Sequence, residues 1–160
     1  MRIILIMILV GVAVPLRAQS TVERDAVLKA MQVFLDTMTA RDIDGARAIL
    51  VPQGRFHSMR AGNPEPRSIS NEEYLAQLQA SKQTMRERIW NPVVQVHGAI
   101  ATVWAPYDFW IDGKYSHCGI DAFDFIKTKD GWKMAGGVYT VEQNCEPGPL
   151  GPLKPGEVRF

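Results

Sequence analysis

Asp108, His117 and Asp121, two carboxylates and one imidazole, lie among aromatic residues in the stretch 102–123. Asp112 and Gly113, flanked by alternating apolar residues, predict a two-residue β-turn with positive φ at both positions. Following the strand ladder back from this turn places Asp108 opposite His117, with their Cβ atoms about 5 Å apart. Because a carboxylate can orient an imidazole ring and raise its basicity, Asp108 and His117 are a candidate acid–base pair.

Asp121 lies four residues beyond His117. That spacing is about 13 Å along an extended strand, so the two side chains cannot pair directly. Asp121 is therefore either a second acid or base, or a buried group hydrogen-bonded to a helix terminus. The Asp108–His117 pair also has an alternative interpretation. An exposed cross-strand ion pair near a turn contributes under about 1 kcal/mol and needs no functional role.

Four aromatic residues share the predicted face with these groups. An antiparallel sheet usually separates polar from apolar side chains by face, so the mixture predicts a cavity for a small hydrophobic or aromatic molecule. The predicted ligand-binding residues are Trp104, Trp110, Tyr115 and Phe123, although Trp104 also fits a core position. The opposite face is apolar, with Tyr107, Phe109, Ile120 and Ile126, and is a candidate subunit interface.

Several motifs that carry other chemistries are absent from the sequence. It contains no phosphate-binding glycine loop, no nucleophile elbow and no CxxC. Neither His57 nor His97 has metal-ligand spacing around it. We therefore expect neither a metal nor an organic cofactor, and we assign His57 and His97 no chemistry.

The composition is that of one ordinary folded domain. The chain has 160 residues, of which 46% are hydrophobic and 22% charged, and its formal net charge is +1. Disordered chains combine low hydrophobicity with high net charge, so this class is excluded. A near-neutral chain without a basic patch is also a poor partner for nucleic acid.

The N-terminus has the pattern of a secretory signal peptide. Arg2 precedes an apolar run from residue 3 to 16, and the small residue Ala18 follows. This run is shorter than the about 20 residues that span a bilayer, so we expect no stable membrane anchor. We predict a signal peptide at 1–18, cleavage after Ala18, and a periplasmic or secreted protein whose net charge falls to −1 because Arg2 and Arg17 are removed.

The mature chain would then consist of a folded domain at 19–145 and a Pro/Gly-rich flexible tail at 146–160. Cys118 and Cys145 are its two cysteines. An oxidising compartment permits a disulfide between them, but a domain of this size can fold without one. A bridge and two free buried thiols both remain open.

Helical periodicity occupies the first half of the domain. Ser20 and Glu23 form a candidate capping box for a long amphipathic helix that ends near Ala40. Asp42 can cap a short second helix that ends before Pro52. A second capping box at Ser70 and Glu73 begins a third helix, which we expect to run to about Gln83.

The second half of the domain has the alternating pattern of strands. We predict four main strands at 86–96, 100–111, 114–127 and 132–141. Residues 52–69, rich in Pro and Gly, predict an irregular segment with one short candidate strand at 55–59. Gly136 and Gly137 predict close packing or a bend in the last strand rather than a phosphate site.

Helices followed by a twisted antiparallel meander, with D-G-W-K-M at 130–134, resemble the nuclear-transport-factor-2-like superfamily. SnoaL-like proteins of the uncharacterised exported bacterial branch look most similar, through RDIDGARAIL at 41–50 and SHCGIDAFDFIKTKDGWKMAGGVYTVE at 116–142. The likeness covers about residues 21–142. It implies an α+β cone-like fold, with three N-terminal helices packed on a strongly curved sheet of four main strands that encloses a pocket. It also implies a homodimer through the outer face of the sheet.

The fold resemblance does not settle function, because the superfamily hosts isomerases, dehydratases and non-catalytic binding modules. Our first hypothesis is an exported pocket protein that binds a small hydrophobic or aromatic molecule. The second is a cofactor-free isomerase or dehydratase that uses the His117–Asp108 pair with Asp121 as second acid or base. A third is a non-catalytic dimeric interaction domain, and whether the chain is an enzyme remains open.

Overall fold

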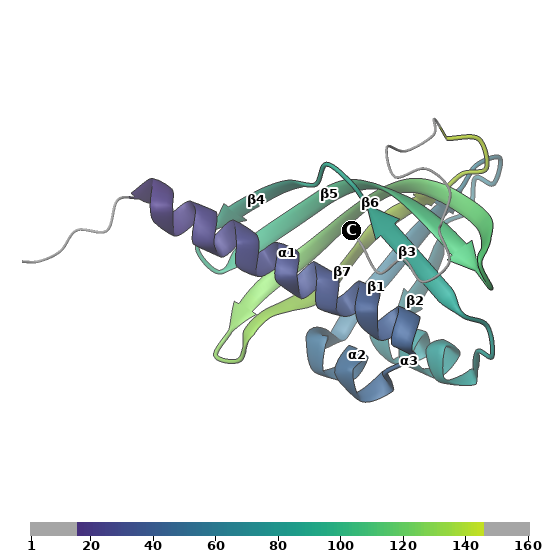
Figure 1. Ribbon diagram of the computed structural model, residues 1–160, viewed down its shortest axis with the longest axis horizontal. Helices are drawn as coiled ribbons and strands as arrows, with labels where there is room; N and C mark the ends of the chain where they lie inside the picture. The colour runs from purple at the N-terminus through teal and green to yellow at the C-terminus, as the bar shows by residue number, and fades with distance from the viewer. Residues whose placement is uncertain (1–15, 146–160) are drawn as a thin grey trace, which may run out of the picture.

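The computed structural model describes residues 16–145, with side chains from residue 21 onward, as an α+β fold in which helices pack on one sheet (Figure 1). The three expected helices are present, but the sheet has seven strands rather than four main ones. The elements are α1 (Leu16–Ala40), α2 (Ile43–Ile49), β1 (Leu50–Arg60), β2 (Arg67–Ser70), α3 (Asn71–Ala80), β3 (Met85–Ile89), β4 (Val93–His97), β5 (Ile100–Ile111), β6 (Lys114–Thr128) and β7 (Gly131–Val141).

The sheet runs in the order β2-β1-β7-β6-β5-β3, and β4 also pairs with β5. All neighbours are antiparallel except β1 and β7, which are parallel. The helix α1 crosses the sheet, while α2 and α3 lie together at one end of it (Figure 1). We call the side of the sheet that faces these helices the inner face, and the other side the outer face.

The N-terminal part of the core comes from the apolar stripe of α1. Val27, Met31, Phe34 and Leu35 are all buried, as the helical spacing predicts. The predicted start of this helix is wrong, because α1 begins at Leu16 and Ser20 therefore lies inside it. The Glu23 carboxylate instead accepts hydrogen bonds from Lys127 Nζ (2.6 Å) and Trp132 Nε1 (3.0 Å), and so ties α1 to the sheet.

The caps of the two shorter helices are confirmed. The Asp42 carboxylate accepts from the Gly45 N–H at 2.9 Å at the start of α2. At α3, Ser70 Oγ accepts from the Glu73 N–H, and the Glu73 carboxylate accepts from the Ser70 N–H. Each cap satisfies a backbone donor that a helix N-terminus leaves without a partner.

The prediction of an irregular segment at 52–69 is wrong in part, because these residues contain most of β1 and the start of β2. The strand β1 lies between β2 and β7, and its Phe56 is buried in the core. Its Gly54 allows a close backbone approach, since a Cβ there would lie 1.9 Å from the Ala135 carbonyl oxygen. Pairing with distant strands therefore outweighs the local breaking tendency of Pro52 and Gly54.

The strand predicted at 86–96 is two strands, β3 and β4. The chain breaks at Asn91, whose φ is 46°, followed by Pro92. Because proline has no N–H for a ladder, one continuous strand is disfavoured here. Gly136 and Gly137 have φ of 139° and 157° beside a bulge in the β6–β7 pairing. The predicted close packing is confirmed, because a Cβ at Gly136 would lie 2.1 Å from the Arg55 carbonyl oxygen.

Two predicted segments lie wholly or mostly outside the described residues. Of the predicted signal peptide at 1–18, only residues 16–18 belong to the described part of the chain, and they form the first turn of α1. The predicted tail at 146–160 lies beyond them entirely.

Candidate functional site

The hairpin that carries the predicted site has the expected turn but a different register. Asp112 and Gly113 have φ of 50° and 74°, as a two-residue turn of this type requires. Trp110 pairs with Tyr115 as predicted, but His117 then pairs with Phe109 and not with Asp108. The extra residue is Ser116, which makes a β-bulge.

One inserted residue reverses which β5 side chains share a face with the later part of β6. His117, Asp121 and Phe123 therefore lie with Tyr107 and Phe109 on the inner face, where all five line one cavity. The prediction that Tyr107 and Phe109 belong to an outer interface is wrong.

The cavity has a volume of about 330 Å³ and lies between the inner face and the helices α1 and α3. This is at the small end of the range for sites that bind small organic molecules, about 300–1,000 Å³. Its walls are mostly aromatic and aliphatic, with a few acidic, hydroxyl and amide groups. The lining residues are Phe34, Met38, Phe56, Arg67, Ile69, Tyr74, Gln77, Leu78, Ser81, Met85, Glu87, Tyr107, Phe109, His117, Asp121, Phe123 and Tyr139.

Two carboxyl groups on the cavity wall are hydrogen-bonded to each other. Asp121 comes from β6 and is 1% exposed, and Glu87 comes from β3 with a buried Oε1. Burial is the main cause that raises the pKa of Glu87 to about 7, and it also raises the pKa of Asp121 well above its usual value. A hydrogen bond between two carboxyl groups requires that one of them is protonated, so the pair shares one proton.

The carboxyl pair has few other partners. Apart from the bond that joins them, neither Glu87 Oε1 nor Asp121 Oδ2 has a hydrogen-bond partner among the described residues. The hydroxyl of Tyr74, on the same cavity, is also buried without a described partner. Buried polar atoms in folded proteins are nearly always hydrogen-bonded, to protein or to ordered water, so these three atoms mark where a ligand or water binds.

His117 lines the cavity but has no carboxylate partner in the described structure. Its ring stacks on Phe109, with 4.8 Å between ring centroids, and its Nδ1 lies 3.0 Å from Ser116 Oγ. Burial, and then the positive charge of Arg60, lower the pKa of His117 below its usual value. The ring is therefore mainly neutral at pH 7. A neutral ring suits the aromatic wall of the cavity better than a cationic ring would.

The predicted Asp108–His117 pair is wrong, because Asp108 lies on the outer face. There its carboxylate forms a two-point ion pair with Arg88 of β3, including an Nε to Oδ1 distance of 2.9 Å. The Arg88 guanidinium also lies 5.3 Å from the centroid of the Trp110 ring. Both charged side chains are at most 12% exposed, so this pair is part of the packed structure rather than a surface contact.

The outer face also holds three of the four predicted ligand-binding aromatics, and only Phe123 lines the main cavity. Tyr115 packs edge to face on Trp110. Trp104 is 53% exposed and contributes to a shallow, mostly apolar groove. This outer groove is lined by His57, Met59, Pro66, Trp104, Ile120, Ala122, Val138, Tyr139 and Thr140.

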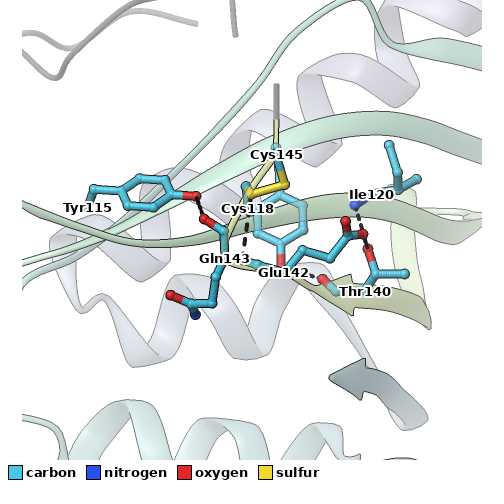
Figure 2. Close-up of a disulfide and its surroundings, with 8 residues drawn as sticks. Tyr115, Cys118, Ile120, Thr140, Glu142, Gln143 and Cys145 are labelled. Atoms are coloured by element: carbon cyan, nitrogen blue, oxygen red, sulfur yellow. Dashed lines mark hydrogen bonds between the residues drawn. A yellow bond between two sulfur atoms is a disulfide. The ribbon is translucent and has the colours of Figure 1, made fainter. Parts of the chain in front are cut away.

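Cys118 and Cys145 form a disulfide, which resolves the alternatives left open by the sequence (Figure 2). It attaches the segment after β7 to β6, where Cys118 also exchanges two backbone hydrogen bonds with Glu142. The Tyr115 hydroxyl donates to the Gln143 carbonyl close by (Figure 2). The disulfide therefore reinforces the end of the sheet beside the Arg88–Asp108 pair, since Asp108 pairs with Cys118.

Sequence reasoning missed Glu87, although a signal for it was present. Met85, Glu87 and Ile89 alternate along β3, and the two apolar members of this set pack on the core. Period-2 alternation therefore puts Glu87 on a buried face. A carboxyl group there needs a partner, and Asp121 was already expected to be buried.

The described residues contain neither a cluster of metal-ligating side chains nor a membrane-spanning helix. No group of three or more His, Cys, Asp or Glu side chains within them could hold a metal ion. No helix within them has the length and apolar character needed to cross a membrane.

Comparison with known proteins identifies the family. Residues 22–140 match the family described as "Putative lumazine-binding", and the chain belongs to it. Together with the structural matches below, this places the chain in the nuclear-transport-factor-2-like superfamily, as the sequence motifs indicated. No curated protein matches the chain.

Several solved structures share the fold at low sequence identity. A Streptomyces avermitilis protein described as a "putative dehydratase" from this superfamily has a TM-score of 0.64 and 18% identity, over 78% of this chain and 99% of that one. A Salmonella enterica superfamily member has a TM-score of 0.61 and 13% identity, over 81% and 98%. A Novosphingobium aromaticivorans protein with a cystatin-like fold has a TM-score of 0.62 and 12% identity, over 78% and 85%.

Proposed function

We propose that this protein binds a small hydrophobic or aromatic molecule in the inner cavity. The observation that carries the proposal is an aromatic-walled cavity of about 330 Å³ containing a hydrogen-bonded carboxyl pair and a buried, unpartnered Tyr74 hydroxyl. A few polar groups in an apolar pocket are typical of sites that orient small ligands. The description of the family as lumazine-binding supports the same function.

Two measurements test this function. The first is native mass spectrometry of the protein purified from its own host, followed by denaturation to identify any released molecule. The second is a fluorescence titration with lumazine as a defined aromatic probe. A retained molecule, or saturable binding of the probe, is the expected result. The proposal fails if the protein is empty and neither lumazine nor a panel of small aromatic compounds binds.

A matched pair of variants locates the binding site. Gln77 lines the cavity from the exposed side of α3, whereas Gln79 is exposed on the same helix and does not line it. We expect Gln77→Trp to block the entrance and weaken binding about ten-fold or more, and Gln79→Trp to leave it unchanged. Equal effects of both substitutions would place binding elsewhere.

The carboxyl pair also supports a catalytic alternative, an acid–base enzyme of isomerase or dehydratase type. Asp121 and Glu87 would carry the protons in it, since Asp108 is paired with Arg88. The test is to incubate the molecule released in native mass spectrometry with the protein and follow its conversion by liquid chromatography. If Asp121→Asn abolishes conversion but retains binding, the enzyme is supported, whereas the absence of conversion supports a binding protein.

The outer groove is the part of the molecule best suited to homodimer contact, and it replaces the interface expected from the sequence. Trp104 and Val138 expose 53% and 54% of their surfaces there, in an apolar setting. We expect Val138→Asp to convert a dimer to a monomer in sedimentation velocity. Val22→Asp, at a similarly exposed position of α1, is the control. A wild-type protein that is monomeric would rule out this interface.

Export is the remaining part of the proposal. The Cys118–Cys145 disulfide fits an oxidising compartment, and Arg2 with the apolar run behind it fits a signal peptide. Intact-mass measurement of protein from the periplasm or medium should show a chain beginning at Gln19. A cytoplasmic, full-length protein would contradict export.

A further inference from the structure

The inner cavity is acidic. Its lining contains two carboxyl groups, Glu87 and Asp121, and one side chain with a fixed positive charge, Arg67. Arg67 is exposed at the edge of the cavity and donates to Gln77 Oε1 at 2.8 Å. The described structure therefore offers the carboxyl pair no buried cation.

The causes that raise the pKa values of Glu87 and Asp121 also include no cation. Burial is the largest cause for both Glu87 and Asp121, and the remaining causes are the carboxyls themselves and Asp108. None of these causes is a basic side chain. Arg88 follows Glu87 in β3 but lies on the outer face, paired with Asp108. One proton shared by the two carboxyls thus leaves the pair with a single negative charge when the cavity is empty.

The wall beside the carboxyl pair suits a cation. Phe34, Phe56 and Tyr74 pack around one another with ring centroids 5.5–5.8 Å apart. Phe123 extends this cluster to Tyr139, with 6.4 Å between the ring centroids, and all five rings line the cavity. Aromatic faces attract cations, more strongly when the cation is desolvated, and cages of aromatic rings are used in proteins to bind ammonium groups.

We propose that the ligand of this cavity is a small organic cation, a protonated amine on an aromatic or aliphatic body, whose ammonium group binds at Glu87 and Asp121. The apolar body lies against the Phe34, Phe56 and Phe123 rings, and the Tyr74 hydroxyl accepts or donates one further hydrogen bond. This inference rests on the proposed ligand-binding function and specifies the chemistry of the ligand. The ammonium group neutralises the single negative charge of the pair, and the shared proton stays between Glu87 and Asp121.

A charge series tests the proposal on the unmodified protein. Benzylamine, benzyl alcohol and benzoate have similar shapes but are cationic, neutral and anionic at pH 7.5. Isothermal titration calorimetry should show benzylamine binding about ten-fold or more tightly than benzyl alcohol, and benzoate weakest. Equal affinities for the amine and the alcohol, or a preference for the alcohol or benzoate, would overturn the proposal.

Variants identify the groups responsible. Glu87→Gln keeps the size of the side chain and removes its charge, so it should reduce benzylamine affinity about ten-fold or more while leaving benzyl alcohol affinity unchanged. Asp124→Asn is the matched control, because Asp124 is an exposed carboxyl on the outer face of the same strand as Asp121. Loss of benzylamine binding in Asp124→Asn, or none in Glu87→Gln, would contradict the assignment.

The pH dependence gives an independent readout. The pair gains its negative charge as pH rises through the Glu87 pKa of about 7, so benzylamine affinity should rise between pH 5.5 and pH 8. Below that pKa, calorimetry in buffers of different ionisation enthalpy should show proton release on binding. The titratable or charged groups around the pair are Asp108 from β5, the Tyr74, Tyr107 and Tyr139 phenols, His117 further along β6, and Arg67 at the edge. Glu87→Gln should flatten the rise, whereas His117→Asn should preserve it. A flat profile in the unmodified protein would contradict the proposal.

The two proposals fail in distinguishable ways. If lumazine or a native ligand binds and benzylamine does not surpass benzyl alcohol, the cavity binds small molecules but not by this charge recognition. If no probe binds and Gln77→Trp changes nothing, the ligand-binding function itself is wrong.

Discussion

Two neighbouring residues of β3, Glu87 and Arg88, lie on opposite faces of the sheet and form different kinds of pair. Glu87 faces inward and shares a proton with Asp121, while Arg88 faces outward and forms a two-point ion pair with Asp108. The outer pair is a complementary, hydrogen-bonded ion pair. The inner pair joins two acidic groups in a site where burial raises the pKa values of both. Such an arrangement costs stability, which is typical of groups retained for binding or chemistry.

The largest effect should come from breaking the outer pair. Asp108→Ala leaves the Arg88 guanidinium buried without its carboxylate, and we expect the free energy of unfolding to fall by about 3–5 kcal/mol. Urea unfolding measures this change. Asp124→Ala, at an exposed carboxyl on the outer face, is the control, with an expected change within about 0.5 kcal/mol. Similar losses in the two variants would mean that the outer pair has no special structural role.

The disulfide should have the next largest effect and act on the same side of the sheet. Cys118 and Cys145 close a segment with a sequence separation of 27 residues. Replacing both by Ser should lower stability by about 3 kcal/mol, because the unfolded chain gains conformational freedom. Ligand affinity should remain unchanged, since neither cysteine lines the inner cavity. A large loss of affinity with an unchanged melting temperature would contradict this division between the faces.

A substitution in the inner pair should raise the free energy of unfolding at neutral pH, whereas a substitution in the outer pair lowers it. The pKa of Glu87 rises to about 7 on folding, so the folded state holds its proton more tightly than the unfolded state does. The stabilisation that comes from the raised pKa of Glu87 is fully present below about pH 4.5 and is lost as pH rises toward 7. Glu87→Gln should therefore reduce the fall in stability between pH 4.5 and 7, and stabilise the protein by about 2 kcal/mol at pH 7.5. Urea unfolding at several pH values checks this, and an unchanged pH profile would show that Glu87 is not protonated in the folded state.

The smallest effect concerns His117, whose pKa is lowered by burial and by the positive charge of Arg60. Its ring should titrate below pH 6.5 in NMR spectra of the imidazole carbons. Arg60→Gln should raise the midpoint without removing the whole downward shift, because burial, the larger of the two causes, remains. A midpoint above 7 would indicate a carboxylate partner, as in the hairpin register predicted from the sequence.

Much of the architecture could be predicted because it depends on local patterns. The apolar stripe of α1, the caps at Asp42 and Ser70, and the turn at Asp112–Gly113 all follow from short-range rules. Residues 52–69 could not be predicted in this way, because β1 is a strand through its pairing with β2 and β7, which are contributed by later parts of the chain. Helix propensity and turn signals contain no information about such partners.

For the candidate site, the sequence by itself identified His117, Asp121 and Phe123 as cavity residues, because alternation along one strand places them on a common face. Only the tertiary structure decided what lies opposite them. The bulge at Ser116 shifts the ladder by one residue, moves Asp108, Trp104 and Trp110 to the outer face, and brings Tyr107 and Phe109 inward. Strand alternation has a period of two, so one unpaired residue is enough to exchange the faces. The pairing of Glu87 with Asp121 likewise depends on β3 and β6 both flanking β5, which is a property of the assembled sheet.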